Sequence, residues 1–139
     1  MEIPPKRWLR TAILLGVVYL AVGLTFGALA GSAASHQMVV MWRLAAWVIS
    51  AAAFGAHIWY EYYRLQNPPR TTAWHAAAAV ALGAFALAVA ARVHAHVTAS
   101  GNPRLLTFAL IAWPLLSGLP AFVVAFAAAA GLALRRRAD

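Results

Sequence analysis

Hydrophobic residues fill four long stretches of the chain, and polar residues are concentrated in the short segments between them. Few or no charged residues interrupt these stretches, which run over residues 11–35, 38–60, 71–91 and 105–134. About 20 apolar residues suffice for a helix to cross the ~30 Å hydrocarbon core of a bilayer. A helix satisfies its own backbone hydrogen bonds there, whereas barrel strands would alternate over about 10 residues. The pattern therefore predicts four transmembrane helices.

The expected fold is an all-α integral membrane protein with a single domain over residues 1–139. Its helices are predicted at residues 8–31, 39–65, 71–97 and 104–134. The connections between them are short, so consecutive helices should pack as antiparallel hairpins in an up-down four-helix bundle.

Proline and asparagine mark where helices begin and bend. Asn67 and Asn102 each precede a proline, and an asparagine cap followed by proline in the first turn is typical of a helix start. Pro114 and Pro120 fall inside the last stretch, where each removes a helical hydrogen bond. We therefore expect helix 4 to be kinked at these two positions.

Composition agrees with membrane insertion and narrows the chemistry. The 139 residues are 64% hydrophobic and only 10% charged, against about 25% charged in a soluble domain. The chain contains no cysteine, which excludes disulfides, thiolate metal sites and cysteine nucleophiles.

The net charge of +8 is distributed unevenly along the chain. Eight basic residues fall before helix 1, between helices 2 and 3, or after helix 4, against three at the other ends. The positive-inside rule then places both termini in the cytoplasm and the protein in the cell membrane, the inner membrane of a bacterium. The basic residues are interpreted as topology signals and contacts to anionic headgroups, and not as a nucleic-acid site.

Helix 1 carries glycines at a spacing that keeps small residues on one face: Gly16, Gly23, Gly27 and Gly31. Such a face lets helix backbones approach closely in a membrane. It predicts a packing surface, either within the bundle or between protomers, and favours a homo-oligomer or attachment to other membrane subunits.

Polar residues on helices 2 and 3 recur in steps of three and four, which places them on one face of each helix. The two faces consist of Arg43, Trp47, Ser50, Phe54, His57, Glu61 and Arg64, and of His75, Ala78, Leu82, Phe85, Val89, Arg92 and His96. Polar residues at membrane depth usually turn away from lipid. We therefore expect these faces to form a polar seam between helices 2 and 3.

At the cytoplasmic end of this seam, antiparallel pairing places Glu61 opposite His75, with His57 one turn deeper. A carboxylate beside imidazoles could exchange protons near pH 7, where unperturbed histidine titrates. The alternative is structural, since Glu61 could simply pair with His57 or Arg64 and steady the helix end.

At the outer end the same pairing places Arg43 opposite Arg92, with His96 nearby. Two arginines at one depth repel unless an anion lies between them, such as a phospholipid headgroup, a haem propionate or an anionic substrate. Alternatively, both side chains extend separately to lipid phosphates.

Catalytic motifs are missing from the sequence. There is no helical H-E-x-x-H, G-x-S-x-G, phosphate-binding glycine loop or pair of carboxylates, so neither an enzyme nor a metal site is favoured. The favoured hypothesis is a structural or binding subunit of a larger or homo-oligomeric membrane assembly. A proton- or anion-handling transporter or channel that uses the seam is the first alternative.

The second alternative is an electron-transfer protein that binds haem b, quinone or a pigment. His57 and His75 would be the axial ligands of a haem. Ala56-His57-Ile58-Trp59 resembles the Ala-His…Trp segment by which light-harvesting polypeptides ligate bacteriochlorophyll, which would imply pigment ligation by His57.

Overall fold

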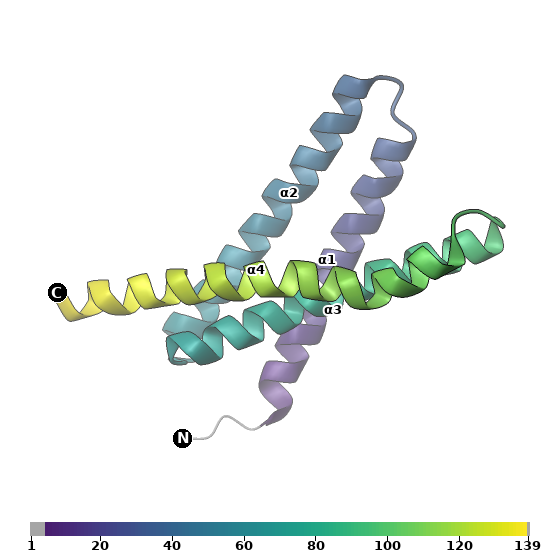
Figure 1. Cartoon of the computed structure of the whole chain (residues 1–139). Helices are drawn as coiled ribbons and strands as arrows, with labels where there is room; N and C mark the ends of the chain where they lie inside the picture. Colours follow the sequence, from purple (N-terminus) through teal and green to yellow (C-terminus); the bar gives the residue numbers. More distant parts are fainter. Residues whose placement is uncertain (1–4, 139) are drawn as a thin grey trace.

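The computed structural model describes residues 5–138, and four long helices contain most of them (Figure 1). They are α1 (Pro5–Gly31), α2 (His36–Trp59), α3 (Pro69–Val97) and α4 (Pro103–Ala138), and a short π-helix, η1 (Tyr60–Arg64), continues α2. All four are long and apolar enough to cross a membrane. The predicted all-α class and the four helices are confirmed, with boundaries shifted by a few residues.

Two of the three later helices begin with a side-chain cap. The hydroxyl of Ser35 accepts a hydrogen bond from the backbone N–H of Met38 at 3.3 Å, and Asn102 Oδ1 accepts one from Arg104 at 3.0 Å. Pro68 precedes α3 and provides no such bond. The cap predicted at Asn102 is therefore present, and the one predicted at Asn67 is wrong, because the Asn67 amide is used elsewhere.

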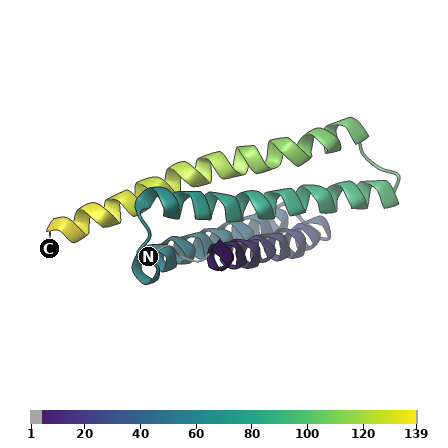
Figure 2. The same ribbon diagram turned by 90° about the horizontal axis from the view of Figure 1, so that it is seen from below.

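The helices form two antiparallel hairpins, α1–α2 and α3–α4, stacked in two layers (Figure 2). The hairpins cross each other in Figure 1, and the α1–α2 turn extends well away from the second hairpin. α3 packs chiefly on α4 and α1, whereas α2 touches α3 at few positions. Four helices side by side in one regular bundle are thus not confirmed.

Glycines lie where helices approach closely, both between the two layers and within the α3–α4 hairpin. A Cβ atom on Gly83 of α3 would lie 2.6 Å from Tyr19 Cβ and 3.3 Å from the backbone oxygen of Gly16, both on α1. A Cβ on Gly118 of α4 would lie 3.2 Å from Ala81 Cβ. Close backbone approach at small residues is how helices gain dispersion contacts in a membrane.

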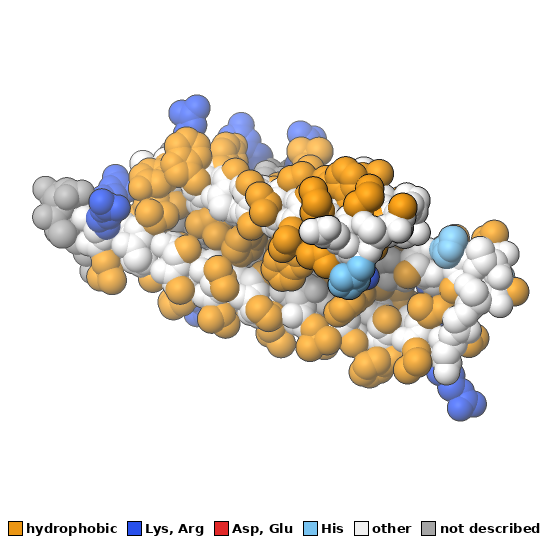
Figure 3. Space-filling view, turned by 90° about the horizontal axis from the view of Figure 1, so that it is seen from above, with side chains coloured by type: hydrophobic (Ala, Val, Ile, Leu, Met, Phe, Trp, Pro, Cys, Tyr) orange, Lys and Arg blue, Asp and Glu red, His pale blue; other side chains and the backbone are white. Residues whose placement is uncertain are grey.

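The interior is thin and rich in alanine. Among residues 7–136, eight of the ten buried apolar residues are alanine, and the other two are Ile58 and Tyr62. Most large apolar side chains therefore point outward, and hydrophobic side chains cover much of the face seen in Figure 3. Such a surface suits a hydrocarbon environment and would be a liability in water.

Helix α4 is unbroken through both of its prolines, Pro114 and Pro120. The kink predicted at these positions corresponds to no break in the helix, and the ribbon bends gently over this part in Figures 1 and 2. Neighbouring groups can compensate for the hydrogen bonds that proline removes from a membrane helix.

Gly83→Ala should destabilise the fold, because the new methyl group would overlap the Tyr19 side chain at the crossing of α1 and α3. We expect the free energy of unfolding to fall by about 1–3 kcal/mol, as for other overpacked interiors. Thermal unfolding in detergent micelles, followed by circular dichroism, measures this. The matched control is Gly131→Ala on α4, where the added Cβ meets nothing within 4 Å. An equal effect of the two substitutions would contradict a crossing held by close contact.

Candidate functional site

The candidate site is built around Glu61, the only acidic residue among residues 5–138. Its side chain is completely buried at the end of α2, within η1. A buried carboxylate is costly unless charges and hydrogen bonds compensate it. The groups around it therefore have to supply that compensation.

Three side chains from two helices and a loop converge on this carboxylate, and together the four residues are called the Glu61 cluster. His75 Nδ1 of α3 lies 2.9 Å from Glu61 Oε2, and Asn67 donates its side-chain amide to the same oxygen. His57 Nε2, one helical turn before Glu61, lies 3.4 Å from Oε1. The contact expected between Glu61 and His75 is present.

The backbone around η1 positions Asn67. Leu65 N–H donates to Tyr60 O at 3.2 Å, the five-residue step of a π-helix, and Asn67 N–H donates to Glu61 O at 3.1 Å. Between them, Gln66 adopts a left-handed conformation with φ = 52°. The chain thus turns back over η1 and brings the Asn67 amide to the carboxylate. Single π-helical turns occur frequently at functional sites.

Helix α1 also contributes to the site, through Trp8. Its indole stacks on the His75 ring, with centroids 5.1 Å apart and planes 4° from parallel. Trp8 and the Glu61 cluster together therefore join α1, α2, η1 and α3 at one end of the molecule.

Burial varies along the line of titratable groups in the cluster. The side chain of His75 is 15% exposed, that of Glu61 is 0% exposed, and that of His57 is 1% exposed. Neither ring nitrogen of His57 has a hydrogen-bond partner, and Glu61 Oε1 also lacks one. Most buried polar atoms in proteins are hydrogen-bonded, so unpartnered atoms call for an explanation.

The outer end of the predicted seam is not formed. Arg92 donates to the Thr107 hydroxyl of α4, whereas Arg43 lines a groove against α1, and His96 is exposed near the end of α3. The physical reason is that α1 packs on the face of α3 expected to meet α2, with Leu82 3.2 Å from where a Gly16 Cβ would be. The seam therefore exists only at the Glu61 end.

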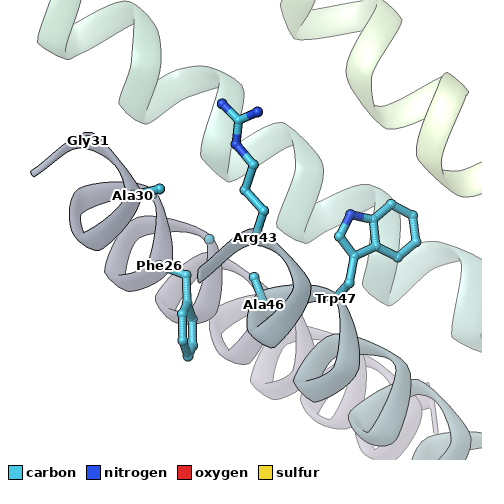
Figure 4. A pocket seen from close by; sticks show the side chains of 8 residues that line it. Phe26, Ala30, Gly31, Arg43, Ala46 and Trp47 are labelled. Carbon is cyan, nitrogen blue, oxygen red and sulfur yellow. The ribbon is translucent and has the colours of Figure 1, made fainter. Parts of the chain in front are cut away.

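The glycine face of α1 has two different environments. Added Cβ atoms on Gly16 and Gly23 would contact Leu82 and Leu87 of α3, so these glycines pack within the chain. Cβ atoms on Gly27 and Gly31 would meet nothing within 4 Å. Both of these glycines line the groove that contains Arg43 (Figure 4).

The cluster does not fit the haem site considered from the sequence. An axial pair of histidines must face each other across the porphyrin plane, but His57 and His75 both contact the Glu61 carboxylate that lies between them. Within the described chain, no group of three His, Cys, Asp or Glu side chains is arranged to hold a metal ion.

Asn67 and Trp8 were not recognised as site residues from the sequence. A buried amide partner could have been suspected for Asn67, since the lone membrane carboxylate six residues earlier needs hydrogen-bond donors. No sequence signal indicated that Trp8 would stack on His75.

Comparisons with known proteins add no assignment to this site. No protein-family model, curated protein or solved structure matches the chain. The geometry of the cluster is therefore the basis for a functional proposal.

His75→Ala should destabilise the protein, because it removes both the hydrogen bond to Glu61 and the stacking partner of Trp8. We expect a loss of about 2 kcal/mol in the free energy of unfolding, typical of a hydrogen bond to a charged group. Thermal unfolding in micelles measures it, with His94→Ala, an exposed position on the same helix, as the control. The control should change the free energy by less than about 0.5 kcal/mol. Equal stabilities of the two variants would contradict a structural role for the cluster.

Proposed function

We propose that the protein is a multi-pass integral membrane protein that handles protons at the Glu61 cluster. Its four apolar helices cross the cell membrane in alternating directions, with both termini and the cluster at the cytoplasmic side. The four candidate spans and the excess of basic residues at the ends on that side support this topology.

A single observation carries the proton-handling proposal: three titratable side chains lie in contact along a line from the surface to the interior. His75 is partly exposed, Glu61 follows at 2.9 Å, and His57 follows at 3.4 Å, fully enclosed. A proton from cytoplasmic water reaches His75 first and passes through the carboxylate to His57. Chains of Asp, Glu and His within membrane spans are the usual proton relays of pumps and transporters.

Charge balance explains why such a cluster binds a proton. A buried carboxylate between two neutral imidazoles has a net charge of −1, which is unfavourable in an apolar environment. One proton on either imidazole makes the cluster neutral while keeping the carboxylate ionised. A single proton shared within the cluster would thus remove its net charge, and either histidine could hold it.

An apolar cluster lies beside the Glu61 cluster, at the same end of α3. Ile58, Ala73, Ala76 and Ala125 form the core at this level, with Phe54 and Phe122 packed against it. Neither ring nitrogen of His57 has a hydrogen-bond partner, so a proton on His57 would cross the rest of the membrane only after a rearrangement. The proposed activity is thus gated, as in a transporter, and differs from that of an open channel.

A second candidate is the structural or binding subunit of a larger or homo-oligomeric assembly. The observation that favours it is the alanine-rich interior, which leaves large apolar side chains on the outside for contact with lipid or other subunits. Native mass spectrometry in mild detergent, with an absorption spectrum of the same sample, distinguishes this candidate. A monomer that carries proton flux without any other subunit would favour the first proposal.

Glu61→Gln should abolish proton movement, because an amide cannot take up the proton while its size preserves the packing. In proteoliposomes with an imposed pH gradient, we expect the flux to fall by a factor of about 10² or more, the usual contribution of a positioned proton-transfer group. An internal pH-sensitive dye measures it.

The control for this experiment is His94→Gln, which changes an exposed histidine outside the cluster. Its flux should equal that of the unaltered protein. Undiminished flux in Glu61→Gln, or no flux above that of empty liposomes in the unaltered protein, would contradict the proposal.

The topology can be tested separately with single cysteines, since the chain has none of its own. Gln66→Cys, in the loop between α2 and α3, should react with a membrane-impermeant maleimide only after cell lysis. Ser100→Cys, in the loop between α3 and α4, should react in intact cells. The opposite labelling pattern would place the termini and the Glu61 cluster on the outer side.

A further inference from the structure

The groove between α1 and α2 near their connecting turn is a second feature of the molecule, separate from the Glu61 cluster. It has a volume of ≈ 400 Å³, within the range of small-molecule sites. Its lining consists of Gly23, Phe26, Gly27, Ala30, Gly31, Arg43, Ala46 and Trp47. This set of residues is called the outer groove.

Arg43 is the only charged residue in the outer groove. Among residues 5–138 the one carboxylate is Glu61, which pairs with His57 and His75, so no protein anion compensates Arg43. An arginine on a membrane span is costly without an anionic or hydrated partner. In Figure 4 its side chain extends from α2 to the same side as the indole of Trp47.

The rest of the groove is apolar and open. Gly27 and Gly31 leave space where larger side chains would fill the floor, since a Cβ at either position meets nothing within 4 Å. Trp47 forms a wall of the groove and is 76% exposed. The ring of Phe26 packs on that of Trp42, with centroids 6.0 Å apart. A cation beside an apolar trough matches a molecule with an anionic head and a hydrocarbon tail.

Arg43 is also at the right depth for a headgroup. It lies seven residues into α2, about 10 Å from the start of that helix. The long arginine side chain can extend its guanidinium toward the interface while its methylene groups stay on apolar surface. Tryptophan is likewise enriched at this level of membrane proteins.

We propose that the outer groove binds an anionic phospholipid of the outer leaflet, with its phosphate on Arg43 and an acyl chain along the floor at Gly27 and Gly31. The guanidinium forms paired hydrogen bonds to the phosphate oxygens, which is its preferred mode of phosphate recognition. This proposal shares with the proposed function the premise that the helices lie in a membrane, and its assignment to the outer leaflet rests on the proposed topology; it does not depend on proton handling.

Native mass spectrometry in detergent tests the proposal by titration with phosphatidylglycerol, and with phosphatidylcholine of the same acyl chains. Arg43→Gln should weaken the binding of phosphatidylglycerol about tenfold or more, as expected for the loss of a charge-assisted contact. Gly27→Leu fills the floor and leaves Arg43 in place, so it should weaken binding of the same lipid by a similar factor.

Two controls separate this site from general attraction to basic residues. Arg104→Gln removes an exposed arginine outside the groove, and Glu61→Gln alters the other site. Both variants should bind phosphatidylglycerol as the unaltered protein does. Failure of the proton-flux experiment would leave these results unchanged, so the two proposals can fail independently.

Several outcomes would overturn the proposal. Equal affinity of Arg43→Gln and the unaltered protein for phosphatidylglycerol would show that Arg43 does not hold the headgroup. Equal loss in Arg104→Gln would show that the lipid is held by charge alone. A dimer that disappears in Gly27→Leu, with lipid affinity unchanged, would assign the groove to a second copy of the chain.

Discussion

The contact between α2 and α3 depends on the compensation of one buried carboxylate. An ion taken out of water costs several kcal/mol unless nearby charges and hydrogen bonds replace its hydration. Glu61 obtains its partners from α2, the following loop and α3, and Trp8 of α1 covers one of them. α2 and α3 make few other contacts, so this cluster is the principal junction between these two helices, whereas α1 joins the hairpins by packing on α3.

The end of the predicted seam nearest the loop between η1 and α3 could be predicted from the sequence. The end farthest from that loop could not. A connection of only a few residues fixes the register of the two helices beside it, so Glu61 and His75 were bound to meet. That register predicts contacts farther along only if the helices stay side by side. They do not, because Gly16 and Gly83 let α1 cross close to α3, and Arg43 and Arg92 acquire different neighbours.

The helix cap predicted at Asn67 is wrong for a related reason. Asn67 and Asn102 stand in the same Asn-Pro context, and only Asn102 caps its helix. The side chain of Asn67 instead donates its amide N–H to the buried carboxylate, and its oxygen does not cap α3. The π-helical turn that makes this contact reachable has no signature in Tyr60–Arg64 by composition. The hydrogen bond to the buried carboxylate therefore determines where the Asn67 side chain lies, and the local sequence signal does not.

The crossing of the hairpins explains why the molecule has two polar sites of opposite character. At the end with Trp8 and His75, three helices converge, water is excluded and a carboxylate can be enclosed with its partners. Beyond the contact of Gly23 with α3, the α1–α2 turn extends away from the second hairpin (Figure 1). Cβ atoms on Gly27 and Gly31 would meet nothing within 4 Å, and Arg43 is exposed. The enclosed end suits the proposed proton exchange at Glu61, because only enclosure makes the charge state of a group matter to the fold. The open end suits the proposed lipid at Arg43, because the partner of this cation must come from outside the chain.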